Sequence, residues 1–130
     1  MHISLSGNII QGKEKQYNKT GYIIHGEVYK QRSDIKTIIH VHTPEITAIS
    51  SIKDGLMPLS QWSYHFYKKI AYHEYNSLLL DAKNQGIKLV SDLGDKNVMI
   101  MRNYGAITCG KTIYKPFFTF ATFKWLQKPK

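Results

Sequence analysis

Two histidines separated by one residue, His40 and His42, are the side chains of this sequence best placed for chemistry. They lie in a β-branched run, residues 36–42, which predicts a strand. Residues i and i+2 of a strand point to the same face, so the two imidazoles would converge on one point. Such a pair can hold a metal ion, or it can simply be packed and hydrogen-bonded. The spacing leaves both interpretations open, because His-x-His also occurs by chance.

A metal site needs more donors than this pair. Zinc in a catalytic site takes about three protein ligands and keeps one position open. The other candidate metal ligands are His25, His65, His73 and the carboxylates. We predict a structural or supporting role for His25, which lies beside Tyr22 and Ile24 on a predicted helix. His73 either lines the site or forms a hydrogen bond with a neighbour.

Other reactive residue types have simpler interpretations. We predict that Cys109 is a small buried filler on a strand, because no neighbour suggests a nucleophile. Asp92 and Asp95 sit beside a turn, where capping explains them better than catalysis. Lys96 and Arg102 can pair with a phosphate, but a solvated surface position is the simpler interpretation.

The elements that must position these residues alternate between helices and strands. Such alternation predicts a layered α/β domain. The predicted elements are a short strand, turn and strand over 1–12, a helix from Asn18 or Thr20 to Arg32, the strand 36–42, a helix from Pro44 to Ile52, an ambiguous aromatic-rich segment 62–75, a helix over 78–93, strands at 97–101 and 105–108, and a final helix over 116–126.

Length and composition bound the class of protein. The chain has 130 residues, of which 42% are apolar and 21% charged, so we expect one globular domain over 1–130. No apolar run approaches the ~20 residues that a membrane span needs. The start has no secretory pattern, and there is a single cysteine. We therefore expect a cytoplasmic protein without a membrane partner.

The net charge of +9 invites a nucleic-acid interpretation, which we do not favour. Sixteen of the 18 basic residues are lysines, scattered along the chain, and only two are arginines. Readers of bases and phosphates rely on arginine forks. Lysine, isoleucine and tyrosine are also the residues that an A/T-rich genome favours, so codon bias alone explains the excess.

Four stretches together resemble the class II aldolase/adducin family, in the subgroup nearest adducin heads and short bacterial relatives. They are NKTGYIIH (18–25), IIHVHTPEITAISSIKDGLMPLSQ (38–61), IAYHEY (70–75) and LVSDLGDKNVMIMRNYGAITCGKT (89–112). The resemblance implies a three-layer α/β/α fold with a mixed, mostly antiparallel sheet. The chain begins about one third of the way along its relatives, so we expect the N-terminal part, with its Gly/Ser-rich phosphate loop, to be lacking.

The resemblance also implies an activity. Active members are zinc-dependent lyases or epimerases that act on small sugar phosphates, such as fuculose or ribulose phosphates. The metal, held by three histidines, stabilises the enediolate that forms when a carbon–carbon bond breaks. A carboxylate serves as acid/base, and the active site lies between the subunits of a tetramer.

Carried over residue by residue, the family pattern is incomplete here. His40 and His42 match the first two zinc ligands, but the position of the third is Tyr104. A neutral phenol, with a pKa near 10, is a poor zinc ligand at pH 7. The position of the family's acid/base glutamate is Gly21 in this chain. Adducin-like members also have glycine there. We therefore expect Zn²⁺ to bind weakly or not at all, and the lyase chemistry to be impaired.

Two other interpretations stay open. The chain is an active lyase if His73, His65 or water replaces the third ligand. Alternatively it is a non-catalytic, adducin-like oligomerising module, or a decayed fragment. The final helix favours association, because its apolar residues cover most of its circumference. An unpaired sheet edge would add to this, so we expect a homo-oligomer, a tetramer by family. The apolar residues are Phe117, Phe118, Phe120, Phe123, Trp125 and Leu126.

Overall fold

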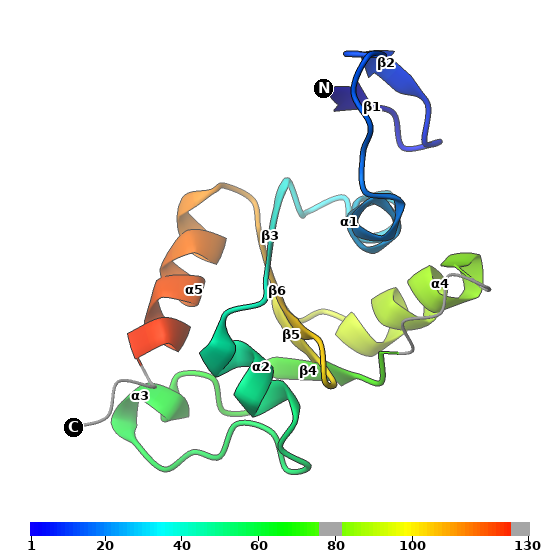
Figure 1. Cartoon of the computed structure of the whole chain (residues 1–130). Coiled ribbons are helices and arrows are strands. Elements are labelled where there is room, and N and C mark those ends of the chain that lie inside the picture. The colour runs from blue at the N-terminus through cyan, green and yellow to red at the C-terminus, as the bar shows by residue number, and fades with distance from the viewer. Residues whose placement is uncertain (76–81, 126–130) are drawn as a thin grey trace.

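A four-stranded mixed sheet forms the centre of the molecule (Figure 1). A computed structural model describes residues 1–75 and 82–125. In the sheet order β3-β6-β5-β4, β6 is antiparallel to β3 and to β5, and β4 is parallel to β5. The mixed, mostly antiparallel sheet is therefore confirmed. Its strands are β3 (Thr37–Val41), β4 (Ile70–His73), β5 (Val98–Met101) and β6 (Gly105–Gly110).

Helices cover both faces of the sheet, which confirms the three-layer α/β/α arrangement. Helices α1 (Lys19–Gln31) and α4 (Ala82–Leu93) pack on each other on one face. On the other face lie α2 (Pro44–Ser50), α3 (Gln61–Tyr64) and α5 (Tyr114–Trp125) (Figure 1). A separate antiparallel hairpin of β1 (His2–Ile3) and β2 (Ile9–Gln11) lies beyond α1.

Side-chain alternation along the strands builds two cores. In β5, Met99 and Met101 face the layer of α1 and α4, whereas Val98 and Ile100 face the layer of α2 and α5. Ile24 and Val28, four residues apart on α1, are both buried in the first core. Every residue of β5 is buried, as expected of a strand covered on both faces.

Local capping explains where two helices begin. The Asn18 side chain accepts hydrogen bonds from the backbone N–H groups of Thr20, at 2.9 Å, and Gly21, at 3.3 Å. Thr43 caps α2 by accepting from the Ile46 N–H at 3.4 Å, and Pro44 occupies the first turn.

Some expected boundaries differ from those observed. The ambiguous segment 62–75 contains both the short helix α3 and the strand β4. The final helix begins at Tyr114, two residues earlier than expected, because Pro116 is tolerated in a first turn. Residues 78–81 of the helix predicted over 78–93, and Leu126, lie outside the described residues. Within 1–75 and 82–125, no helix is long and apolar enough to cross a membrane.

Candidate functional site

The structure brings His40, His42 and Tyr104 together on the face of the sheet that α1 and α4 cover. His40 lies in β3, and His42 follows one residue after the strand ends. Their ring centroids are 4.5 Å apart. The Tyr104 ring centroid lies 4.3 Å from that of His42 and 5.4 Å from that of His40. Three rings from two separate segments therefore form one cluster.

A tight turn between β5 and β6 delivers Tyr104 to the histidines. Met101 pairs with Gly105 across the turn, so only three residues connect the two strands. The middle one, Asn103, has a positive φ of 53°, which asparagine tolerates better than most residues. Because β6 also pairs with β3, with Ala106 opposite Val41, the turn ends beside His42.

Gly105 permits this close approach. A Cβ atom at this position would lie 2.5 Å from the Val41 carbonyl oxygen and 3.0 Å from Nδ1 of His42. Contacts that short do not occur with backbone atoms in folded proteins, so a larger residue would displace the turn. The glycine of the sequence Arg-Asn-Tyr-Gly thus sets the distance between Tyr104 and His42.

One hydrogen bond fixes the tautomer of His42. Its Nδ1 lies 2.7 Å from the backbone carbonyl oxygen of Tyr104. A carbonyl oxygen only accepts, so Nδ1 carries the proton and donates it. In this tautomer the lone pair is on Nε2. The His42 residue is exposed to solvent. Histidines that bind metals are commonly oriented by such a bond from their other nitrogen.

His40 is held as a neutral imidazole. Burial, followed by the nearby rings of His42 and His25, lowers the pKa of His40 to about 4. Its Nε2 atom is buried and has no hydrogen-bond partner within the described part of the chain. A buried nitrogen without a partner is unusual in a folded protein. His40 therefore offers a free nitrogen inside the cluster.

The phenol of Tyr104 is engaged with a second tyrosine. The rings of Tyr75 and Tyr104 stack with centroids 3.9 Å apart and planes inclined by 11°. Burial, followed by the hydrogen bond with Tyr104, raises the pKa of Tyr75 above its usual range. The two tyrosines stack on each other and pack against the core beside the histidines.

The other histidines have separate environments. The His25 ring lies 6.2 Å from that of His40, and burial lowers the pKa of His25. Nδ1 of the buried His73 is 2.7 Å from Oδ2 of Asp92, so this histidine bonds a neighbour rather than the cluster. His65 lies on the opposite face of the sheet, where it lines a cavity.

Three further residues have structural surroundings. Arg102 donates to the carbonyl oxygen of Ile52 and lies over the Tyr72 ring, 4.7 Å from its centroid, so it joins a loop to the sheet. Cys109 is 1% exposed in the core, as expected of a filler. Asp92 contacts His73 from within α4 rather than capping a turn, which corrects its expected role.

Comparison with known families agrees with this geometry. The sequence pattern of the Class II Aldolase and Adducin N-terminal domain matches residues 1–128. The chain belongs to this family. A crystal structure of an aldolase II superfamily protein from Pseudomonas syringae is 35% identical, with a TM-score of 0.88, and the match covers 95% of this chain and 50% of that chain.

Two other members of the family show its breadth. L-fuculose 1-phosphate aldolase from Glaciozyma antarctica is 26% identical, with a TM-score of 0.74, over 95% of this chain and 47% of that chain. Alpha-adducin from Rattus norvegicus is 33% identical over 119 residues, which are 89% of this chain and 16% of the adducin. The chain spans less than half of the length of the curated relatives that it matches.

The donors present do not make up the three-ligand zinc site that the fold family implies. His40 and His42 have suitable nitrogen atoms, but the ring that completes the cluster is a phenol bound to Tyr75. Among the described residues, no group of three or more His, Cys, Asp or Glu side chains is arranged to hold a metal ion. The cluster therefore offers two imidazoles and one phenol.

Two contacts at this site were not predicted from the sequence. The stacking of Tyr75 depends on the path of the chain after β4, and no spacing signals it. The pair of His73 and Asp92 joins a strand to a helix, 19 residues apart. The shared family stretch around IAYHEY was the available signal for both Tyr75 and His73.

Proposed function

We propose that this chain is a class II aldolase and adducin domain in which the lyase chemistry is lost. One observation carries the proposal: the ring beside His40 and His42 is Tyr104, not an imidazole. Two imidazoles and a phenol bind zinc far more weakly than three imidazoles do. The sugar-phosphate chemistry that the family performs depends on that metal.

The position of the acid/base residue supports the same proposal. Gly21 lies in the first turn of α1 and has no group that transfers a proton. A Cβ atom there would meet only Asn18 atoms, at 3.9 Å and beyond, so there is space for a side chain. The surroundings of residue 21 therefore leave room for a carboxylate side chain, but the sequence has glycine there.

The direct test is an aldolase assay of the purified chain with added zinc. The substrates are L-fuculose 1-phosphate and ribulose phosphates. The missing ligand and the missing acid/base each cost about two powers of ten or more, so we expect no measurable cleavage. Turnover at about 1 per second or faster, an ordinary enzyme rate, would mean that other residues supply the chemistry and would overturn the proposal.

A second candidate function, an oligomerising or interaction module, is favoured by exposed apolar side chains beside α2 and on α3 and α5. Contiguous exposed apolar patches are typical of protein interfaces. Phe117 and Phe118 are 62% and 73% exposed, and Leu59 is 81% exposed. The similarity to alpha-adducin points in the same direction. The side chains of Phe123 and Trp125 lie outside the described residues.

Light scattering of the purified chain tests this second candidate. We propose a symmetric homo-oligomer, a tetramer as in the family. At tens of micromolar the scattering mass should then be a multiple of 15.0 kDa. The variant Phe118→Ser should lower that mass. A monodisperse 15.0 kDa species would show that the exposed face needs no cover from a second copy.

A further inference from the structure

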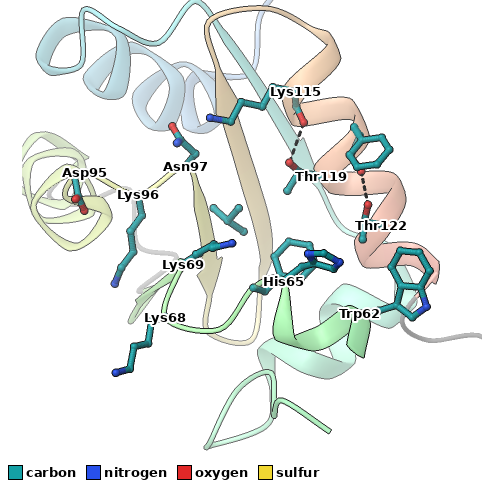
Figure 2. A pocket seen from close by; sticks show the side chains of 13 residues that line it. Trp62, His65, Lys68, Lys69, Asp95, Lys96, Asn97, Lys115, Thr119 and Thr122 are labelled. Atoms are coloured by element: carbon teal, nitrogen blue, oxygen red, sulfur yellow. Dashed lines mark hydrogen bonds between the residues drawn. The ribbon is translucent and has the colours of Figure 1, made fainter. Parts of the chain in front are cut away.

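A cavity of about 650 Å³ lies on the side of the sheet away from the histidine cluster. It is bounded by α3 and the turn after it, by the start of β5 and by α5 (Figure 2). Its volume falls within the ~300–1,000 Å³ that is usual for small-molecule sites. The proposed loss of lyase chemistry concerns the other face, so it leaves this cavity unexplained.

Lysines from three segments surround the cavity. They are Lys68 and Lys69 before β4, Lys96 before β5 and Lys115 in α5. In Figure 2 Lys69 points toward the side of His65, while the Lys68 and Lys96 side chains extend away from α5. Lys115 reaches toward Asn97 (Figure 2). Cations gathered around one hollow attract anions to it.

Little negative charge balances these lysines. Asp95 is the single carboxylate of the lining. Across 1–75 and 82–125, no ion pair joins Lys68, Lys69, Lys96 or Lys115 to a carboxylate. A hollow lined by charges of one sign raises the local concentration of oppositely charged ions. A phosphate group, with up to two negative charges, fits this surplus better than a single carboxylate.

Aromatic rings give the cavity a second character. Phe66 and Val98 are buried at its base. Trp62, 57% exposed, and Phe118 lie at its edge. Exposed aromatic faces beside cationic groups are the combination that stacks flat rings of phosphorylated compounds. A phosphate alone would use the lysines and leave these rings without a role.

Two hydroxyl groups on α5 add hydrogen-bond acceptors. Thr119 donates its hydroxyl proton to the Lys115 carbonyl oxygen at 2.8 Å, and Thr122 donates to that of Phe118 at 2.9 Å (Figure 2). Each oxygen keeps its lone pairs for an incoming N–H or O–H group. The α5 wall therefore offers acceptors at Thr119 and Thr122 beside the donor of Lys115.

We propose that this cavity binds a small ligand in which a phosphate is joined to a flat ring, the class to which mononucleotides belong. The phosphate lies among Lys69, Lys96 and Lys115, and the ring lies against Trp62 and Phe118. Polar groups on the ring reach the hydroxyls of α5. This site is independent of Tyr104, and a Tyr104 variant should leave it unchanged.

Tryptophan fluorescence tests the proposal directly. The chain has two tryptophans, so Trp125→Phe leaves Trp62 as the reporter. The probes are adenosine monophosphate, uridine monophosphate and phenyl phosphate. Adenosine and inorganic phosphate, the two halves of the first probe, are tested separately. We expect saturable quenching by at least one ring phosphate with a Kd below about 1 mM. Each half alone should bind at least about tenfold more weakly. Calorimetry on the unaltered chain should give the same constant.

Two lysine variants separate a built site from general attraction to a basic protein. Lys69→Gln should weaken binding by about tenfold, the loss of one charge-assisted contact. Lys15→Gln removes the same charge from the segment before α1, on the other side of the sheet, and should change Kd less than twofold. The proposal is overturned if no ring phosphate binds below about 1 mM, if phosphate alone binds as well, or if both variants weaken binding equally.

Discussion

The carbonyl oxygen of Tyr104 accepts a hydrogen bond from Nδ1 of His42 at 2.7 Å. This bond ties the backbone of residue 104 to the histidine pair, whatever side chain residue 104 carries. The side chain of residue 104 therefore lies beside the two histidines. In this chain it is a phenol, which stacks on Tyr75 and adds no third imidazole to His40 and His42.

Substitution of Gly105 should separate these two residues. Gly105→Ala places a methyl group against the Val41 carbonyl oxygen and the His42 ring, so the turn must shift. We expect a loss of about 1–3 kcal/mol in the free energy of unfolding, as for overpacking. Urea denaturation measures it. Gly21→Ala, where there is space, is the matched control and should not destabilise. Equal stabilities for both variants would contradict the close approach at Gly105.

Restoring a carboxylate at Gly21 should stabilise the fold without restoring activity. Gly21→Glu replaces a helical glycine and puts an acidic group in the first turn of α1, near the positive end of the helix. We expect a gain of about 1 kcal/mol, measured as a raised midpoint in thermal unfolding. Gly21→Gln, which lacks the charge, should gain less. A destabilised Gly21→Glu variant would mean that this turn is more crowded than described.

The neutral state of His40 predicts a pH dependence of stability. Its pKa of about 4 in the folded protein lies below the usual value of 6.5, so the unfolded chain takes up the proton first. The contribution is complete above about pH 6.5 and is lost as the pH falls toward 4. Solvent still reaches part of the ring, so we expect a loss of about 1–2 kcal/mol rather than the full shift.

Urea denaturation in the presence of a chelator, at steps between pH 7.5 and pH 4, measures this loss. In His40→Gln the pH slope should flatten, because no proton is taken up at this position. His2→Gln, at an exposed residue of β1, should keep the slope of the parent chain. The interpretation fails if His40→Gln retains the full pH dependence.

The sequence predicted those features that depend on local patterns. The β-branched run around His40 is a strand, and helices begin next to Asn18 and at Pro44, as expected. The segment 62–75 stayed ambiguous because its aromatic residues suit either structure. Pairing with β5 decides that residues 70–73 form a strand, and β5 lies more than 20 residues further along the chain.

Tertiary contacts account for the features that could not be predicted from the sequence. The stacking of Tyr75 on Tyr104 joins the end of β4 to the turn before β6. The lysine cavity gathers Lys69, Lys96 and Lys115 from three elements, although each lysine is unremarkable in sequence. From the sequence, a solvated surface position is expected for Lys96. Its place beside this cavity follows from the pairing of β4 with β5, which brings the segments before the two strands together.

Zinc titration of the parent chain and of Tyr104→His, followed by calorimetry, tests the central claim most directly. Tyr104→Phe is the control, because it removes the phenol without adding a ligand. An imidazole at residue 104 would complete a three-histidine set beside His40 and His42, so we predict that Tyr104→His binds zinc at least about 100-fold more tightly than the parent chain. The phenylalanine variant should bind no more tightly than the parent. Tight binding by the parent chain, or no gain in Tyr104→His, would contradict the account that Tyr104 stands in the place of the third ligand.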